Sequence, residues 1–89
     1  MQIKKIIDQA KDTSGKSLGE LAADMNVKQS AITAWKKGDY RPGPSQIIYL
    51  AECAKIPAIE TLATIESEAH PDMAEFWKRA VRELRQNQG

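Results

Sequence analysis

The residue types best suited to a chemical task lie on one side of the segment 28–37, between Val27 and Gly38. If this segment is a helix, which turns by about 100° per residue, its apolar residues fall within an arc of about 140°. These residues are Val27, Ala31, Ile32 and Trp35. The opposite side carries an amide, two hydroxyls and two ammonium groups, from Gln29, Ser30, Thr33, Lys36 and Lys37. A helix face with these groups and no carboxylate suits the base edges of a DNA major groove.

Each group on this side matches a feature of duplex DNA. The Gln29 amide can pair with adenine at two atoms, and Ala34, beside Ser30, can touch a thymine methyl group. Lys28 and Arg41 stand just before and just beyond the segment, where they can reach backbone phosphates. A polar helix face is more often a solvated surface. The absence of acids, the short turn before the segment and the position of Arg41 favour DNA binding here.

A second helix must position this segment. Its apolar residues follow the helical spacing i, i+3, i+4, i+7, as Leu18, Leu21, Ala22 and Met25. Ser17 can cap this helix with Glu20 as its capping-box partner, and Asn26 tolerates the left-handed conformation that ends a helix. The turn at residues 25–27 is too short for an antiparallel hairpin. We therefore expect the two helices to cross steeply near the small Ala22, as a helix-turn-helix unit over residues 18–37.

Four other segments show helical spacing, and the alternation typical of strands is absent. The first carries Ile3, Ile6, Ile7 and Ala10 and is predicted to stop before Thr13. The others run over about residues 45–54, 57–69 and 72–86, with breaks at residues 41–44 and 70–71. The sequence therefore predicts an all-α fold of five helices and a C-terminal sixth helix.

Residues 17–54 also contain a recognisable combination of residues at characteristic positions. These are Ala22, Asn26, Ile32 and Trp35, followed by Gly38, Pro42 or Pro44, and Leu50-Ala51. The combination resembles the helix-turn-helix of Cro and the phage repressors, and residues 62–84 are more weakly similar to the tail of short phage-related regulators. The resemblance implies a five-helix DNA-binding domain over residues 1–70, dimeric and acting on transcription.

The same resemblance implies roles for individual residues. Base-reading positions fall on Lys28, Gln29, Ser30, Thr33 and Ala34, and backbone-binding positions on Lys37 and Arg41. Two residues depart from the family pattern. Leu18 stands where many members have a Gln that grips phosphate, and Asn26 replaces the usual turn Gly at a modest conformational cost.

The last segment, residues 71–89, has a second apolar face. It consists of Met73, Phe76, Trp77, Ala80, Val81 and Leu84. The sequence leaves open whether this face folds back onto the five-helix domain or forms the seam of a symmetric dimer, and both are possible together, since Phe76 and Trp77 lie at different angles around the helix.

The composition argues against several other classes of protein. Residues 1–50 carry a net charge of +3 and residues 51–89 carry −2, so an anionic partner is expected at the N-terminal half. Cys53 is the single cysteine and His70 the single histidine, so we expect no disulfide, no metal site and no cofactor. No nucleophile has a nearby histidine partner, which argues against an enzyme. Without a signal or membrane-spanning segment, we expect a soluble, cytoplasmic protein.

Taken together, these patterns predict a sequence-specific regulator of transcription that binds double-stranded DNA through the major groove. One module makes few base contacts, so we expect a homodimer, a phage-type repressor in kind, on an inverted repeat with half-sites about 10 bp apart or a multiple of that. The alternative is a protein-interaction module, such as the antitoxin of a toxin–antitoxin pair.

Overall fold

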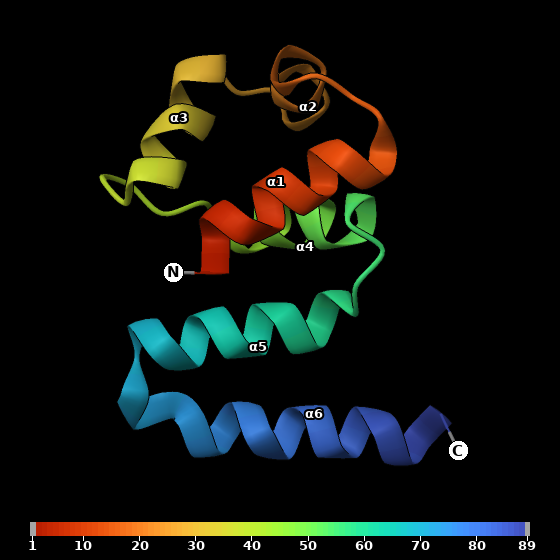
Figure 1. Cartoon of the computed structure of the whole chain (residues 1–89). Helices are drawn as coiled ribbons and strands as arrows, with labels where there is room; N and C mark the ends of the chain where they lie inside the picture. Colours follow the sequence, from red (N-terminus) through yellow and green to blue (C-terminus); the bar gives the residue numbers. More distant parts are fainter. Residues whose placement is uncertain (1, 89) are drawn as a thin grey trace.

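The computed structural model describes residues 2–88, which form six α-helices and one short 3₁₀-helix (Figure 1). The elements are α1 (Gln2–Ser14), α2 (Leu18–Met25), α3 (Gln29–Lys37), α4 (Pro44–Cys53), α5 (Ala58–Ala69), η1 (Pro71–Met73) and α6 (Ala74–Gln88). Residues 2–88 contain no strand, so the all-α prediction is confirmed.

Several predicted helix boundaries are wrong by one or two residues. The first helix continues through Ser14, because Gly15 takes a left-handed conformation (φ +74°) and its N–H closes the last turn on Lys11 O at 3.0 Å. Pro57 is the N-cap of α5 and not part of its first turn. The last helix is divided, because the 3₁₀ turn η1 follows His70 and only then does α6 begin.

The start of α2 is capped as the sequence predicts. The Ser17 hydroxyl accepts the Glu20 N–H at 3.2 Å, and the Glu20 carboxylate accepts the Ser17 N–H at 3.0 Å. This reciprocal pair satisfies two donors at the helix start, so α2 begins at a fixed residue.

Left-handed residues end α2, α3 and α4 and set the angles between the helices. Asn26, Gly38 and Lys55 have φ values of +58°, +85° and +59°. In each case the N–H of the next residue bonds to the carbonyl five positions before it, at 2.9–3.0 Å. The chain reverses so sharply at Asn26 that only residues 26–28 separate α2 from α3.

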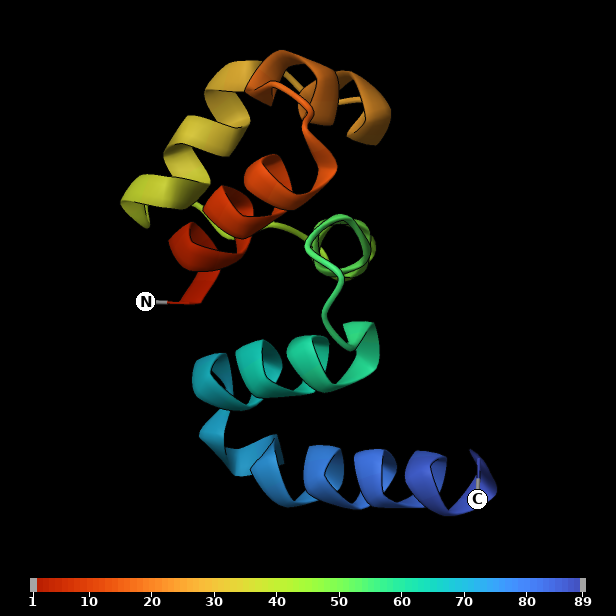
Figure 2. The same cartoon turned by 45° about the vertical axis from the view of Figure 1, so that its right-hand side comes forward.

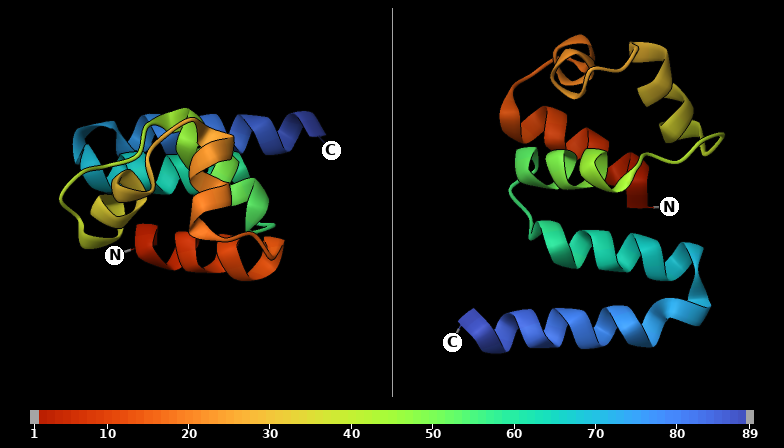
Figure 3. Two further views of the ribbon diagram at one scale, coloured as in Figure 1. Left: turned by 90° about the horizontal axis from the view of Figure 1, so that it is seen from above. Right: turned by 180° about the vertical axis from the view of Figure 1, so that it is seen from behind.

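The helices form successive layers from one end of the molecule to the other (Figures 1 and 2). α2 and α3 lie at one end, and α1 packs against both α3 and α4. α5 packs on α4, and α6 packs on α5 and η1 at the opposite end. The view from behind shows the same order (Figure 3, right). α3 and α6 therefore occupy opposite ends of the chain's layers.

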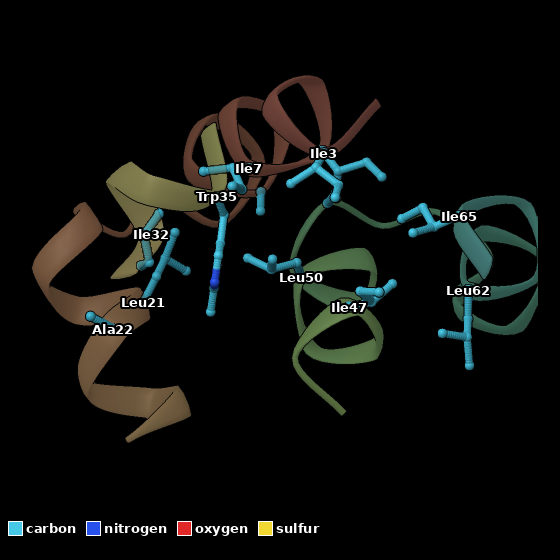
Figure 4. Packing of buried hydrophobic residues seen from close by; sticks show 13 residues of the cluster. Ile3, Ile7, Leu21, Ala22, Ile32, Trp35, Ile47, Leu50, Leu62 and Ile65 are labelled. Atoms are coloured by element: carbon cyan, nitrogen blue, oxygen red, sulfur yellow. The ribbon is translucent and has the colours of Figure 1, made fainter. Parts of the chain in front are cut away.

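A continuous apolar core joins these layers (Figure 4). Its buried members are Ile3, Ile6, Ile7, Ala10, Leu21, Ala22, Ile32, Trp35, Ile47, Leu50, Ala54, Leu62 and Ile65. Leu62 and Ile65 come from α5 and meet Ile3 and Ile47, so α5 is part of the same core. The helical spacings in the sequence identified the members of this core that lie in α1, α2 and α3.

The conformation of Lys55 generates a stability prediction. A residue with a Cβ in the left-handed region costs about 1–2 kcal/mol, and glycine avoids this strain at the expense of greater freedom in the unfolded chain. Lys55→Gly should therefore raise the free energy of unfolding by up to about 1 kcal/mol, measured by urea denaturation. Lys55→Ala keeps the strain and serves as the control. Equal stabilisation by both variants would contradict this explanation.

Candidate nucleic-acid interface

The inner side of α3 fixes which residues lie on its outer side. Ile32 is fully buried and Trp35 is 6% exposed, whereas Val27 and Ala31 are half-buried at the edge of the core. Figure 4 shows the Trp35 ring between Leu21 of α2 and Leu50 of α4. The predicted apolar side of this helix is thus the side that packs, and this packing determines which residues face outward.

The outer side of α3 carries most of the residues predicted to bind DNA. Lys28, Gln29, Ser30, Thr33 and Lys37 are exposed, and Ala34 is half-buried beside them. The helix itself, from Gln29 to Lys37, contains no acidic residue. Lys28 is its N-cap and provides no side-chain cap, so the first N–H groups of α3 are not occupied by a capping side chain.

Gln29 and Thr33, on the outer side of α3, each lie close to backbone atoms of the protein. The Gln29 side-chain oxygen lies 3.5 Å from the position that a Cβ on Gly19 would take, so this amide rests against the first turn of α2. The Thr33 hydroxyl donates a long bond of 3.4 Å to the Gln29 carbonyl. Gln29 therefore occupies the corner where α2 and α3 meet.

Lys36 is turned away from the other polar residues of α3. Its ammonium group lies 3.1 Å from Asp8 on α1, and only 27% of its side chain is exposed. Asp8 also binds Lys4 at 3.2 Å, and the hydrogen bonds from Lys36 and Lys4 hold the pKa of Asp8 below its ordinary value. The sequence grouped Lys36 with the outer residues, and the acid on α1 that attracts it was not visible from the α3 pattern.

Arg41 also has an acidic partner. Its guanidinium group lies 3.3 Å from Glu66 on α5, with 40% of the Arg41 side chain exposed. Within residues 2–88, no carboxylate lies at ion-pair distance from Lys28 or Lys37. Among the predicted basic residues, Lys28 and Lys37 therefore have their charge most available to an outside anion.

Tyr40 is an exposed residue that the sequence analysis did not select. It lies in the loop after α3, next to Arg41, and 71% of its surface is accessible. A phenol can donate a hydrogen bond to a phosphate oxygen. Its neighbours in the chain are Asp39 and Arg41, so the signal that identifies it is an aromatic residue directly before Arg41, which attention to charged residues alone overlooks.

A polar cluster anchors α2 to α4. Asp24 on α2 accepts hydrogen bonds from Lys16 at 2.5 Å and from the hydroxyl of Tyr49 on α4. These two bonds hold the pKa of Asp24 below its ordinary value, while burial and the bond to Asp24 raise the pKa of Tyr49. The Lys16 ammonium group also lies 6.0 Å from the centre of the Tyr49 ring. Because α2 is fixed in this way, the turn to α3 is fixed as well.

The apolar residues predicted on the last helix divide into two groups. Trp77 packs against the core, and Ala80 and Val81 are half-buried. Met73, Phe76 and Leu84 are 42%, 51% and 36% exposed. Packing on the core therefore accounts for part of this face and leaves the other part accessible.

A groove of about 610 Å³ runs between α5 and α6. Ala63, Trp77 and Val81 form its apolar part, and Arg85 crosses to Glu60 with an Nε–Oε1 distance of 2.6 Å. Within residues 2–88, no three His, Cys, Asp or Glu side chains gather as a metal ion would need. None of the helices in that range combines the length and apolar character of a membrane crossing.

The raised pKa of Tyr49 can be measured directly. In a Tyr40→Phe variant, Tyr49 is the remaining tyrosine, so phenolate absorbance reports its titration alone. We expect a midpoint above the ordinary value of about 10 in the folded protein and a return to about 10 in denaturant. Since the folded pKa is the higher one, the stability linked to Tyr49 is complete below about pH 10 and is lost as the pH rises through the folded pKa. A folded midpoint near 10 would contradict the Tyr49–Asp24 bond.

Comparison with known proteins gives no relative for this chain: no family model, no curated protein and no solved structure matches it.

Proposed function

We propose that this protein is a sequence-specific regulator of transcription, of the phage-repressor type, that inserts α3 into the major groove of double-stranded DNA. In this proposal α2 and α3 act as a helix-turn-helix unit. Gln29, Ser30 and Thr33 contact base edges, and Ala34 lies against a thymine methyl group. Lys28, Lys37 and Arg41 contact phosphates, with Tyr40 as a further donor.

The observation that carries this proposal is the contrast between the two sides of α3. Its inner side is held by Ile32 and Trp35, and its outer side is polar, free of acids and exposed at one end of the molecule. A helix that is fixed on one side and accessible on the other can enter a groove without rearrangement of the fold.

Lys36 and Arg41 are expected to contribute less to phosphate binding than Lys28 and Lys37, because each of them already forms an ion pair within the protein. For Arg41 to bind a phosphate it must leave Glu66, and for Lys36 to do so it must leave Asp8. Both pairs are partly exposed, and such pairs contribute at most about 1 kcal/mol. An exchange of carboxylate for phosphate is therefore energetically accessible, but Lys28 and Lys37 require no exchange.

Selection of bound duplexes from a random library, at about 150 mM salt, tests sequence-specific binding. We expect an inverted repeat to be enriched. Gln29→Ala should then relax the preference at one or two base positions, with a loss of about 1–3 kcal/mol of discrimination. Equal loss of affinity for all sequences would assign Gln29 to the fold or to phosphate. Failure to enrich any sequence, together with a stoichiometric protein partner on co-purification, would favour an antitoxin-like interaction protein.

The salt dependence of binding tests the role of Lys37. One phosphate contact contributes about 0.9 to the slope of log K against log salt concentration, so Lys37→Ala should reduce the slope by about that amount on every sequence. Lys78→Ala is the matched control, because Lys78 lies on α6 at the opposite end and pairs with Glu75. Equal slopes for Lys37→Ala and the unmodified protein would remove Lys37 from the interface.

A further inference from the structure

An apolar strip runs along one flank of α6. Phe76, Ala80 and Leu84 recur every four residues, so they lie within about 80° of one another around the helix. Phe76 is 51% and Leu84 36% exposed, and Ala80 is half-buried between them. Exposed large apolar side chains in a row are more typical of a contact surface than of an ordinary exterior.

This strip lies beside the α5 contact and not on the outermost side of α6. Trp77 and Val81, which face α5, are about 60° and 100° from Ala80 in one direction around the helix. In the other direction come Glu83 and Arg79, at about 60° and 100°. Within residues 2–88, neither of these two charged side chains forms an ion pair.

We propose that two copies of this chain pair through the strip, with their α6 helices antiparallel and a twofold axis passing beside Ala80. This inference rests on the proposed function, because the dimer would serve to bind an inverted repeat in DNA. What it adds is the geometry of that dimer. It concerns Phe76, Ala80 and Leu84, whereas Trp77 and Val81 remain within each copy's own core.

The spacing of the strip is symmetric about Ala80, as such a twofold axis requires. Phe76 lies four residues before Ala80 and Leu84 four residues after it. In an antiparallel pair, Phe76 of each copy therefore meets Leu84 of the other copy at the same level, which gives two equivalent contacts. The two Ala80 residues face each other at the centre, where their small side chains allow a close approach of the helices.

The charges beside the strip are complementary in the same arrangement. The twofold axis brings the flank with Arg79 and Glu83 against the same flank of the second copy. Arg79 of one copy and Glu83 of the other then differ by two residues in level, about 3 Å along the helix axis. Two Arg79–Glu83 pairs form across the dimer. The two Arg79 side chains also differ by two residues in level, but each lies about 100° around its helix from Ala80, farther from the contact than Glu83 at about 60°.

This geometry has a consequence for DNA binding. The axis of two helices packed flank to flank and antiparallel runs along the direction in which the layers α6, α5, α4 and α3 are stacked (Figure 1). Both copies of α3 then lie at the same end of the dimer, as an inverted repeat requires. A parallel pairing would turn the two α3 helices toward opposite ends.

Disulfide trapping tests the contact at the twofold axis. In a Cys53→Ala background, Ala80→Cys places two thiols opposite each other, within the reach of a disulfide. Mild oxidation of the DNA-free protein should give a cross-linked dimer that keeps its helical circular dichroism. Arg82→Cys in the same background is the control, because Arg82 lies about 160° around the helix from Ala80. Equal cross-linking of both variants, or none of Ala80→Cys, would overturn the proposal.

Charge exchange tests the orientation of the helices. Arg79→Glu and Glu83→Arg should each reduce dimerisation in sedimentation experiments, and a mixture of the two variants should form a mixed dimer, because both cross-dimer pairs are restored. An Arg79–Glu83 attraction within one helix would give no such recovery on mixing. Persistent monomers in the mixture would overturn the antiparallel arrangement. If the protein stays monomeric but binds a half-site with sequence preference, the dimer proposal fails and the DNA-binding proposal stands. The failure of one proposal can therefore be distinguished from the failure of the other.

Discussion

The buried Trp35 side chain holds three helices together and orients α3. Its ring lies between Leu21 of α2 and Leu50 of α4, so one side chain joins three helices (Figure 4). Removal of a buried aromatic side chain costs about 3–5 kcal/mol, a large share of the stability of a small domain. Since Trp35 and Ile32 must face inward, Gln29, Ser30 and Thr33 must face outward, and packing alone decides which groups α3 presents to a partner.

The direction of α3 depends on local backbone chemistry as well as on this core. The left-handed Asn26 ends α2, and the cluster of Lys16, Asp24 and Tyr49 holds α2 against α4. At the opposite end of the molecule, α6 packs on α5 and η1, and its side chains Phe76 and Leu84 stay partly accessible. The two ends of the molecule thus carry different surfaces, the acid-free polar side of α3 at one end and a charged helix with an apolar strip at the other, and the layers between them keep the two apart.

Much of this structure could be predicted from periodicity, and the exceptions have physical causes. The six helices, the Ser17–Glu20 cap and the inward side of α3 follow from spacing within about ten residues. The ion pairs of Lys36 with Asp8 and of Arg41 with Glu66 could not be predicted, because each joins segments more than 20 residues apart. The left-handed backbone conformation of Lys55 could not be predicted either, because a lysine does not indicate that conformation. The sequence could not predict which apolar residues of α6 are buried and which are exposed, because this depends on which side of α6 packs against α5.

We propose that α3 is the element that contacts DNA. The most direct measurement is a titration of the isotope-labelled protein with duplex DNA, followed residue by residue through the backbone amide resonances. We expect the largest changes at residues 28–34 and 37–41, with little change along the groove between α5 and α6. Changes confined to α5 and α6, or none on α3 at saturating duplex, would contradict it.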